Sequence, residues 1–293
     1  MIQRVSRNNI DIEKYDACIE NSIQSRIFAY SWYLDIVADN WDVLVLDDYQ
    51  AVMPLPWKRK YFIKYVYPPF WLLELGVYSL SSNINTNIFI KKLDKEFRFV
   101  ELRMNTQNND SSRLIHHQER QMQSISLQDS YETIYSKYSR NRKRDLKKSE
   151  QFNLTLNWDS KPEKMIALFK GNVGKRVKNI KEKEYKALLK IMKICTEKGV
   201  GEMISVFDDK NKLIASAFFL KHKDTVTELV CSTDFKNRNN GANTYFNDSA
   251  IQKYRTSFKV FCFGGSSMIN IANYYRSFGA KNETYYLLKK RLL

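Results

Sequence analysis

Hydrophobic and polar positions alternate along two stretches of the chain that share one plan. Residues 41–60 (WDVLVLDDYQAVMPLPWKRK) and 201–224 (GEMISVFDDKNKLIASAFFLKHKD) each contain an apolar run, an acidic turn and a second apolar run. Alternation with period two on both sides of such a turn predicts a β-hairpin. Because the acidic pairs Asp47-Asp48 and Asp208-Asp209 stand at the same place in each, the hairpins suggest an internal duplication, with chance similarity as the alternative.

Other stretches repeat with the period of an α-helix. Residues 181–199 place Tyr185, Leu188, Leu189, Met192 and Cys195 on one stripe, and Gly199 follows where a helix C′ glycine is expected. Residues 129–151 predict one long basic helix, with Asp129 or Ser130 as its N-cap. Shorter helices are predicted at residues 15–22, 30–40 and 269–280, and single strands at 224–235, 259–266 and 282–293.

Helices that alternate with a mostly antiparallel set of strands predict an α/β sandwich of the α+β type. The 293 residues are enough for two domains, and 43% of them are hydrophobic. No apolar run approaches the roughly 20 residues of a membrane span, and the first residues, MIQRVSRNNIDIEKY, lack the apolar segment of a secretory signal. Four scattered cysteines and three histidines without ligand spacing predict a cytoplasmic protein with no metal site.

The net charge of +16 is concentrated in one part of the chain. Residues 1–100 contain 12 basic and 12 acidic side chains, whereas residues 137–193 contain 18 basic and 6 acidic ones. Two interpretations follow: a pair of solvated lysine-rich helices, or a surface that faces a polyanion such as nucleic acid.

A glycine-containing loop lies between a predicted strand and a predicted helix. The unpaired N–H groups and the dipole of a helix N-terminus favour a bound anion, a glycine lets the anion approach closely, and an arginine adds charge. An ordinary strand-to-helix turn is the alternative interpretation. The residues of this predicted phosphate loop are Arg238, Asn239, Asn240, Gly241, Ala242 and Asn243.

Three stretches, RNRKRDLKKSE, RNNGANTYFNDSAIQKY and FCFGGSSMINIANYYRSFGA, together resemble the Fem-type (FemAB-like) branch of the GNAT-superfamily acyltransferases. The resemblance covers residues 130–293, and YSWYLDIVADNWDVLVLDD and PPFWLLELGVYS extend it to residues 1–125. It implies two GNAT-like domains, 1–125 and 126–293, each with a mixed, mostly antiparallel sheet flanked by helices. The second domain would carry the active site, and the first would shape an acceptor pocket.

The sequence departs from the family pattern at three positions. Asn243 stands where the loop usually ends in Gly or Ala, Gly264 where relatives often carry an acidic residue, and Arg276 where some carry Lys. These departures concern the chemistry of the site and not the fold.

The resemblance implies an N-acyltransferase of bacterial type that moves an acyl or aminoacyl group from an activated donor to an amine. The donor would be a co-substrate, with no permanently bound cofactor. The predicted phosphate loop favours acyl-CoA, whereas the Fem resemblance and the basic helix favour aminoacyl-tRNA. A cell-wall or polysaccharide precursor would supply the amine. A non-catalytic basic module that binds nucleic acid or an anionic precursor is the alternative from a different class.

Two candidate catalytic residues lie in a matched motif, and a third lies on the predicted strand that leads to the loop. Tyr275 would protonate the leaving thiolate, Arg276 would stabilise the oxyanion, and Glu228 would act as general base. Strand alternation places Glu228 on the face of Val226 and Val230. A half-buried tyrosine, a solvated helix-end charge and a buried core acid are the alternatives. Predicted substrate-binding residues are Arg140, Arg142, Lys143 and Arg144 on the basic helix, and Tyr67 and Trp71, which can equally belong to the core of the first domain.

Overall fold

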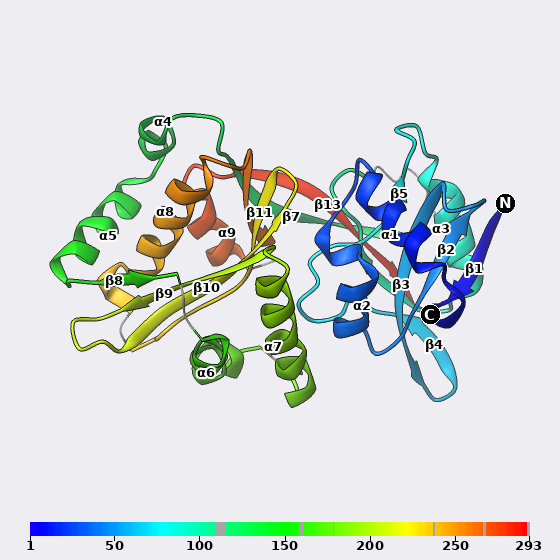
Figure 1. Ribbon diagram of the computed structural model, residues 1–293, viewed down its shortest axis with the longest axis horizontal. Coiled ribbons are helices and arrows are strands. Elements are labelled where there is room, and N and C mark those ends of the chain that lie inside the picture. Colours follow the sequence, from blue (N-terminus) through cyan, green and yellow to red (C-terminus); the bar gives the residue numbers. More distant parts are fainter. Residues whose placement is uncertain (109–114, 159–160, 178, 237, 266–267, 292–293) are drawn as a thin grey trace. The chain divides into compact units, whose positions relative to one another are not determined.

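The computed structural model describes residues 1–108, 115–158, 161–177, 179–236, 238–265 and 268–291 (Figure 1). The chain forms two compact units: unit 1 comprises residues 1–121 and 284–293, and unit 2 comprises residues 122–283. The sequence-based division at 125/126 assigned the last strand to the second domain, whereas the final part of this strand joins unit 1. Two complete GNAT-like domains with the predicted limits stay a prediction.

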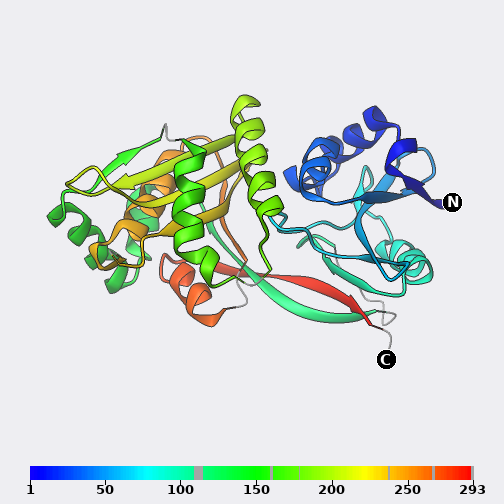
Figure 2. The same cartoon turned by 90° about the horizontal axis from the view of Figure 1, so that it is seen from below.

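Unit 1 contains strands in the order β1-β2-β3-β4-β6-β13, with β5 paired to β3. Within unit 1 the pairs are antiparallel except for β4 with β6. The helices α1 and α2 lie on one face of this sheet and α3 on the other (Figures 1 and 2). The elements are β1 (Ile2–Ser6), α1 (Ile12–Asn21), α2 (Ser31–Val37), β2 (Trp41–Leu46), β3 (Ala51–Lys60), β4 (Ile63–Val66), β5 (Tyr78–Ser79), α3 (Thr86–Glu96), β6 (Val100–Arg103) and β13 (Lys281–Lys290).

Unit 2 contains a sheet with the strand order β7-β12-β11-β10-β9-β8. All neighbours are antiparallel except β11 and β12. The strands are β7 (His116–Ser126, which enters unit 2 at residue 122), β8 (Thr155–Asn157), β9 (Gly201–Phe207), β10 (Leu213–His222), β11 (Thr225–Thr233) and β12 (Val260–Gly265). The helices are α4 (Tyr131–Ser136), α5 (Arg140–Gln151), α6 (Pro162–Gly171), α7 (Glu182–Glu197), α8 (Ala242–Tyr254) and α9 (Ile269–Arg276).

The unit 2 sheet is covered on both faces. Helices α6 and α7 lie on one face, and α5 and α8 on the other (Figure 2). On the α8 face, Phe219 of β10 packs edge-on against Tyr254 of α8, with ring centroids 5.6 Å apart, and Phe261 of β12 lies 5.7 Å from Phe219. These contacts bury the apolar alternation of the second hairpin, as the sequence pattern requires.

Both predicted hairpins are present. Strands β2 and β3 pair from Trp41 opposite Pro56 to Leu46 opposite Ala51, and β9 and β10 also pair antiparallel. The mixed α/β architecture predicted from the sequence is therefore confirmed. In the part of the chain that the structure describes, no helix is both long and apolar enough to cross a lipid bilayer.

The single basic helix predicted over residues 129–151 is wrong. The segment forms two helices, α4 and α5, that are interrupted at Lys137–Ser139. The side chain of Ser139 accepts a hydrogen bond from the Arg142 N–H and caps α5, while its own N–H donates to the Ser277 carbonyl. A mid-segment serine competes for backbone hydrogen bonds and thereby starts a new helix.

Candidate active site on strand β11

The strands β11 and β12 pair over only part of their length. Parallel pairing joins Thr225–Thr227 to Val260–Cys262. Beyond this point β11 continues to Thr233 and β12 to Gly265, and among the described residues no further ladder pair joins the two strands. Glu228 is the first residue of β11 after the paired part, so the predicted base lies where the sheet opens.

A β-bulge in β11 sets which side chains share a face. Phe218 pairs with Val230 and Phe219 with Glu228, so Leu229 is the extra residue. Since successive residues of β10 point to opposite faces, Glu228 and Val230 do too. The expectation that Glu228 shares a face with Val230 is therefore wrong, although it does share one with Val226, which pairs with Lys221.

The same bulge brings a cysteine to the acid. Cys231 pairs with Ala217, which lies two residues from Phe219 and therefore on the same face. The thiol of Cys231 and the hydroxyl of Tyr275 both interact with the Glu228 carboxylate. Sequence reasoning missed Cys231, because regular alternation puts residues three apart on opposite faces, and nothing in the sequence marks the bulge.

The structure brings the predicted acid and base together. The Tyr275 hydroxyl of α9 donates a hydrogen bond to Glu228 Oε1 at 3.2 Å, and both residues are buried. The ring of Tyr275 stacks on Phe263 of β12 with centroids 4.6 Å apart, which holds the hydroxyl in place. Burial raises the pKa of Glu228 to about 7, although the Cys231 thiol and the Tyr275 hydroxyl lower it in part. Burial also raises the pKa of Tyr275.

Arg142 of α5 lies next to this cluster. Its guanidinium lies 4.5 Å from the ring centroid of Tyr274, the neighbour of Tyr275. It donates to Thr244 at 2.6 Å and pairs with Asp145 at 2.9 Å. Within the described residues, Arg142 Nε and Glu228 Oε2 are buried polar atoms without a hydrogen-bond partner. Such atoms are costly in a closed core, and they suit a polar ligand.

The buried carboxyl predicts a pH-dependent stability. Between about pH 4.5 and pH 7, folded Glu228 keeps a proton that the unfolded chain has released. The free energy of unfolding should therefore fall as the pH rises through this window, by about 3 kcal/mol in total from this group. Urea unfolding at pH 5 and pH 7.5 measures the change. Glu228→Gln should remove that share of it, and an equal fall in both proteins would contradict the assignment.

Arg276 does not join the pair. Its guanidinium donates to Asn273 Oδ1 of its own helix, in the last turn of α9. Within the described residues, the Arg276 side chain forms no hydrogen bond or ion pair with Glu228 or with the Tyr275 hydroxyl. Gly264 has a φ of +71°, a left-handed conformation that favours glycine at this position. Ser266 and Ser267 of the same motif lie outside the described residues.

The predicted phosphate loop is partly used by the protein itself. Gly241 caps α8 with a φ of +84°, and a Cβ there would lie 2.0 Å from the Asp145 carbonyl oxygen of α5. Helix packing thus already requires this glycine. The Ala242 N–H donates to Asn240 Oδ1 at 3.1 Å, and Asn243 Oδ1 accepts from the Thr233 hydroxyl at 3.2 Å. The side chain of Asn243 consequently points back to β11.

Arg238 and Asn239 remain exposed on the loop. The Arg238 guanidinium lies 5.6 Å from the ring centroid of Phe235, and that of Arg176 lies 4.0 Å from the same ring. Two cations therefore flank the entry to α8, where an anion would be attracted.

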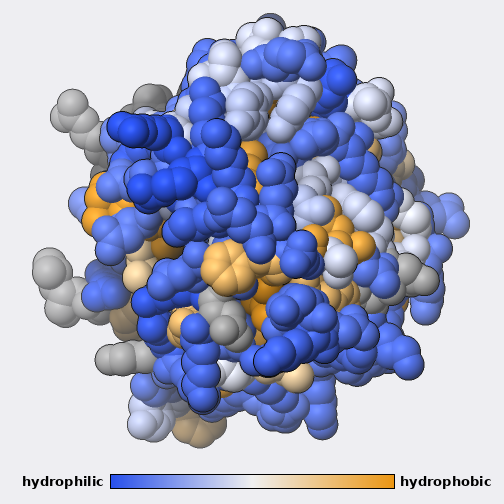
Figure 3. Space-filling view, turned by 90° about the vertical axis from the view of Figure 1, so that its left-hand side faces the viewer, coloured by the Kyte–Doolittle hydropathy of each residue, from blue (hydrophilic) through white to orange (hydrophobic). Residues whose placement is uncertain are grey.

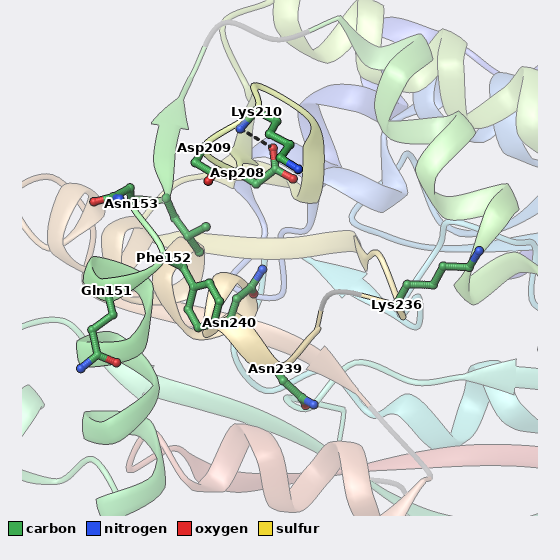
Figure 4. Close-up of a pocket in the computed structure, with 10 residues that line it drawn as sticks. Gln151, Phe152, Asn153, Asp208, Asp209, Lys210, Lys236, Asn239 and Asn240 are labelled. Carbon is green, nitrogen blue, oxygen red and sulfur yellow. Dashed lines mark hydrogen bonds between the residues drawn. The ribbon is translucent and has the colours of Figure 1, made fainter.

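A pocket of about 430 Å³ borders this loop (Figure 4). Asn239 and Asn240 line it from the loop, the β9–β10 turn adds Asp208, Asp209 and Lys210, and the end of α5 adds the half-exposed ring of Phe152. The Lys210 N–H donates to Asp208 Oδ1 at 3.1 Å and closes the turn (Figure 4). The pocket offers amides, two carboxylates and an aromatic face, but neither Glu228 nor Tyr275 lines it.

The predicted substrate-binding residues of α5 divide into two groups. Arg140 and Arg144 are exposed, whereas Arg142 points inward as described above and Lys143 donates to the Ser136 carbonyl at 3.2 Å. The end of unit 2 that carries α4, α5 and α8 is mostly hydrophilic, with scattered hydrophobic residues (Figure 3). A hydrophilic surface of this kind fits both the solvated and the polyanion-binding interpretation.

The predicted acceptor residues Tyr67 and Trp71 belong to unit 1. Lys58 Nζ lies 3.9 Å from the ring centroid of Tyr67, and the Tyr67 hydroxyl accepts from the Asp39 N–H at 3.0 Å. The Trp71 carbonyl accepts from the Tyr33 hydroxyl at 2.5 Å, and Trp71 has a φ of +65°. An acceptor pocket between the two units stays a prediction.

Comparison with solved structures identifies the fold. The chain superimposes on FemX with a TM-score of 0.66 and 10% identity, covering 97% of this chain and 96% of that chain. It matches the L-PGS of Bacillus licheniformis with a TM-score of 0.57 and 10% identity over 97% and 93% of the two chains. A tandem GNAT protein from the clavulanic acid biosynthesis pathway matches with a TM-score of 0.56 and 8% identity over 99% and 98%.

No family model and no curated protein sequence matches the chain. At identities near 10%, these structural matches establish the fold alone. The chain has a GNAT-like fold of the Fem type, as the sequence resemblance predicted.

Proposed function

We propose that this protein is an N-acyltransferase that moves an acyl group from an activated donor to an amine. The observation that carries the proposal is the buried hydrogen bond between Tyr275 and Glu228, at the point where β11 and β12 stop pairing. A carboxyl with a pKa of about 7 is matched to accepting a proton near neutral pH, and a tyrosine beside it can donate one.

In the proposed reaction, Glu228 and Tyr275 both end in the protonation state in which they began. As the amine nitrogen bonds to the acyl carbon, Glu228 Oε2 takes a proton from the nitrogen. The bond between the acyl carbon and the leaving atom breaks, and Tyr275 gives its proton to the leaving group. The protonated Glu228 carboxyl then returns a proton to the Tyr275 oxygen, which restores both groups. Burial disfavours a lasting phenolate at Tyr275, so this return is required.

The donor we favour is acyl-CoA. Its phosphates would lie at the start of α8, near Arg238 and the loop residues Asn239 to Asn243, with the helix dipole adding to the attraction. The amide-lined pocket with Phe152 borders the loop and suits the nucleotide end of such a donor. Aminoacyl-tRNA is the competing donor, supported by exposed Arg140 and Arg144 on α5.

Acetyl-CoA should stabilise the protein in a thermal unfolding assay. At 100 times its dissociation constant, a ligand that binds only the folded state adds about 2.7 kcal/mol. Arg238→Ala should weaken binding about 10- to 100-fold, because it removes one charge-assisted contact. Since this contact exists before and during the reaction, the donor KM should rise while kcat changes little.

Arg255→Ala is the matched control, because Arg255 lies at the opposite end of α8 and its loss changes the net charge equally. If both substitutions weaken acetyl-CoA binding equally, Arg238 contributes only through the net charge of the protein and not through a direct contact. Stabilisation by an aminoacylated RNA hairpin, but not by acetyl-CoA, would identify aminoacyl-tRNA and not acyl-CoA as the donor.

A further inference from the structure

The most exposed aromatic side chains of the described structure stand at the tip of the β3–β4 hairpin. Tyr61 is 84% exposed and Phe62 is 95% exposed. They form a two-residue turn, because Lys60 pairs with Ile63 on either side of them. Ile63, which is 36% exposed, extends this apolar tip. A folded domain gains nothing in its own core from side chains in this position.

The backbone of the turn makes this choice of residues costly. Tyr61 has a φ of +46° and Phe62 a φ of +66°, so both central residues adopt left-handed conformations. A two-residue hairpin turn of this kind favours Asn-Gly or Gly-Gly, and bulky residues are strained there. The chain therefore places two large rings where stability alone would select small residues.

The charges beside the tip are also unfavourable within the isolated chain. Lys58, Arg59 and Lys60 precede the turn and Lys64 follows it, and Arg59 pairs directly opposite Lys64. Like charges at opposed positions of two strands repel. Lys58 pairs with Asp39 at 2.9 Å, whereas among the described residues no acidic side chain forms an ion pair with Arg59, Lys60 or Lys64. Lys64 Nζ lies 4.1 Å from the ring centroid of Trp57, and Lys60 Nζ lies 5.4 Å from that of Tyr61. Three cations without an acidic partner thus surround the two exposed rings.

We propose that residues 58–64 dock the protein on the surface of an anionic lipid bilayer. Exposed aromatic side chains surrounded by lysine and arginine match the two layers of a membrane surface, which are the interfacial zone and the anionic headgroups. Such a contact would relieve the repulsion between Arg59 and Lys64 and cover the rings of Tyr61 and Phe62. A protruding tip also inserts into a fluid interface more readily than it fits a flat protein surface.

The test compares vesicles of phosphatidylcholine alone with vesicles that contain phosphatidylglycerol as well. The protein should sediment with the anionic vesicles and much less with the neutral ones. The double variant Tyr61→Asn/Phe62→Gly should bind the anionic vesicles more weakly by a factor of about ten or more, because it removes two inserted aromatic rings. It should unfold at the same or a higher temperature, since Asn-Gly suits the turn. Leu80→Asn, at an exposed leucine of unit 1, should bind like the parent protein.

A charge-matched pair of variants separates the tip from the general positive charge. Arg59→Thr/Lys60→Thr should lower binding to the anionic vesicles about 30-fold, from about 1 kcal/mol for each basic side chain at the surface. Lys186→Ser/Lys190→Ser, which removes two exposed lysines of α7, should have a far smaller effect. Equal effects of the two pairs, or undiminished binding by Tyr61→Asn/Phe62→Gly, would overturn the proposal. If the parent protein self-associates and Tyr61→Asn/Phe62→Gly abolishes this self-association, the tip is instead a site of protein–protein contact.

Discussion

Tyr275→Phe is expected to lower kcat about 100-fold or more, because the phenol would protonate the leaving group only in the transition state. The substitution keeps the ring that stacks on Phe263 at 4.6 Å and removes only the hydroxyl. The donor KM should change little, since the hydroxyl makes no contribution to donor binding in the ground state. Steady-state kinetics with an acyl donor and an amine acceptor measure both constants.

The variant should remain folded. Loss of the hydroxyl leaves Glu228 with one fewer hydrogen bond, which costs about 1 kcal/mol in a buried site. Tyr185→Phe is the matched control, because Tyr185 is a buried tyrosine of α7 on the other face of the sheet. A kcat in Tyr275→Phe that equals that of Tyr185→Phe would leave Tyr275 as a core residue and withdraw the proposed acid.

Glu228→Gln is expected to lower kcat about 100- to 1,000-fold, because the amide cannot take the proton of the attacking amine. In the parent protein, kcat/KM should rise with pH through about 7, as the Glu228 carboxyl loses its proton. This limb of the pH profile should be absent from the residual activity of the variant. A persistent limb would show that another group titrates.

Glu163→Gln serves as the control, because Glu163 is an exposed acid of α6 that pairs with Lys193 at 2.8 Å, away from the site. Tyr275→Phe/Glu228→Gln should be little slower than the slower single variant, since residues that act as one unit are not additive. Full additivity of the two effects would argue against a shared path for the proton.

The pattern of apolar positions was sufficient to predict the hairpins, the helix that became α7, and the strand–loop–helix order that leads to α9. These elements depend on periodicity and on turn residues, which act over a few residues of chain. The placement of Tyr275 and Glu228 in one half of the chain followed from the motif order. Their direct hydrogen bond required the structure, because 47 residues separate them.

Three features escaped sequence reasoning for physical reasons. The bulge at Leu229 is a property of the pairing between β10 and β11, so regular alternation misplaced Val230 and concealed Cys231. The sequence pattern predicts that Gly241 contacts phosphate, but its lack of a side chain also makes room for the backbone of α5. This contact joins segments almost a hundred residues apart, so the local sequence does not show it. Ser139 caps a new helix within a segment whose composition suits a continuous one.

The division of unit 1 between the two ends of the chain bears on synthesis. Strand β6 pairs with β13, where Arg103 lies opposite Leu287, 184 residues later. Unit 2 has all its residues once position 283 leaves the ribosome, whereas unit 1 still lacks its last strand. At 5–20 residues per second, this edge of β6 waits roughly 9–37 s for its partner. An unpaired strand edge invites aggregation, so we expect the nascent chain to be open to aggregation at β6 until translation has supplied β13.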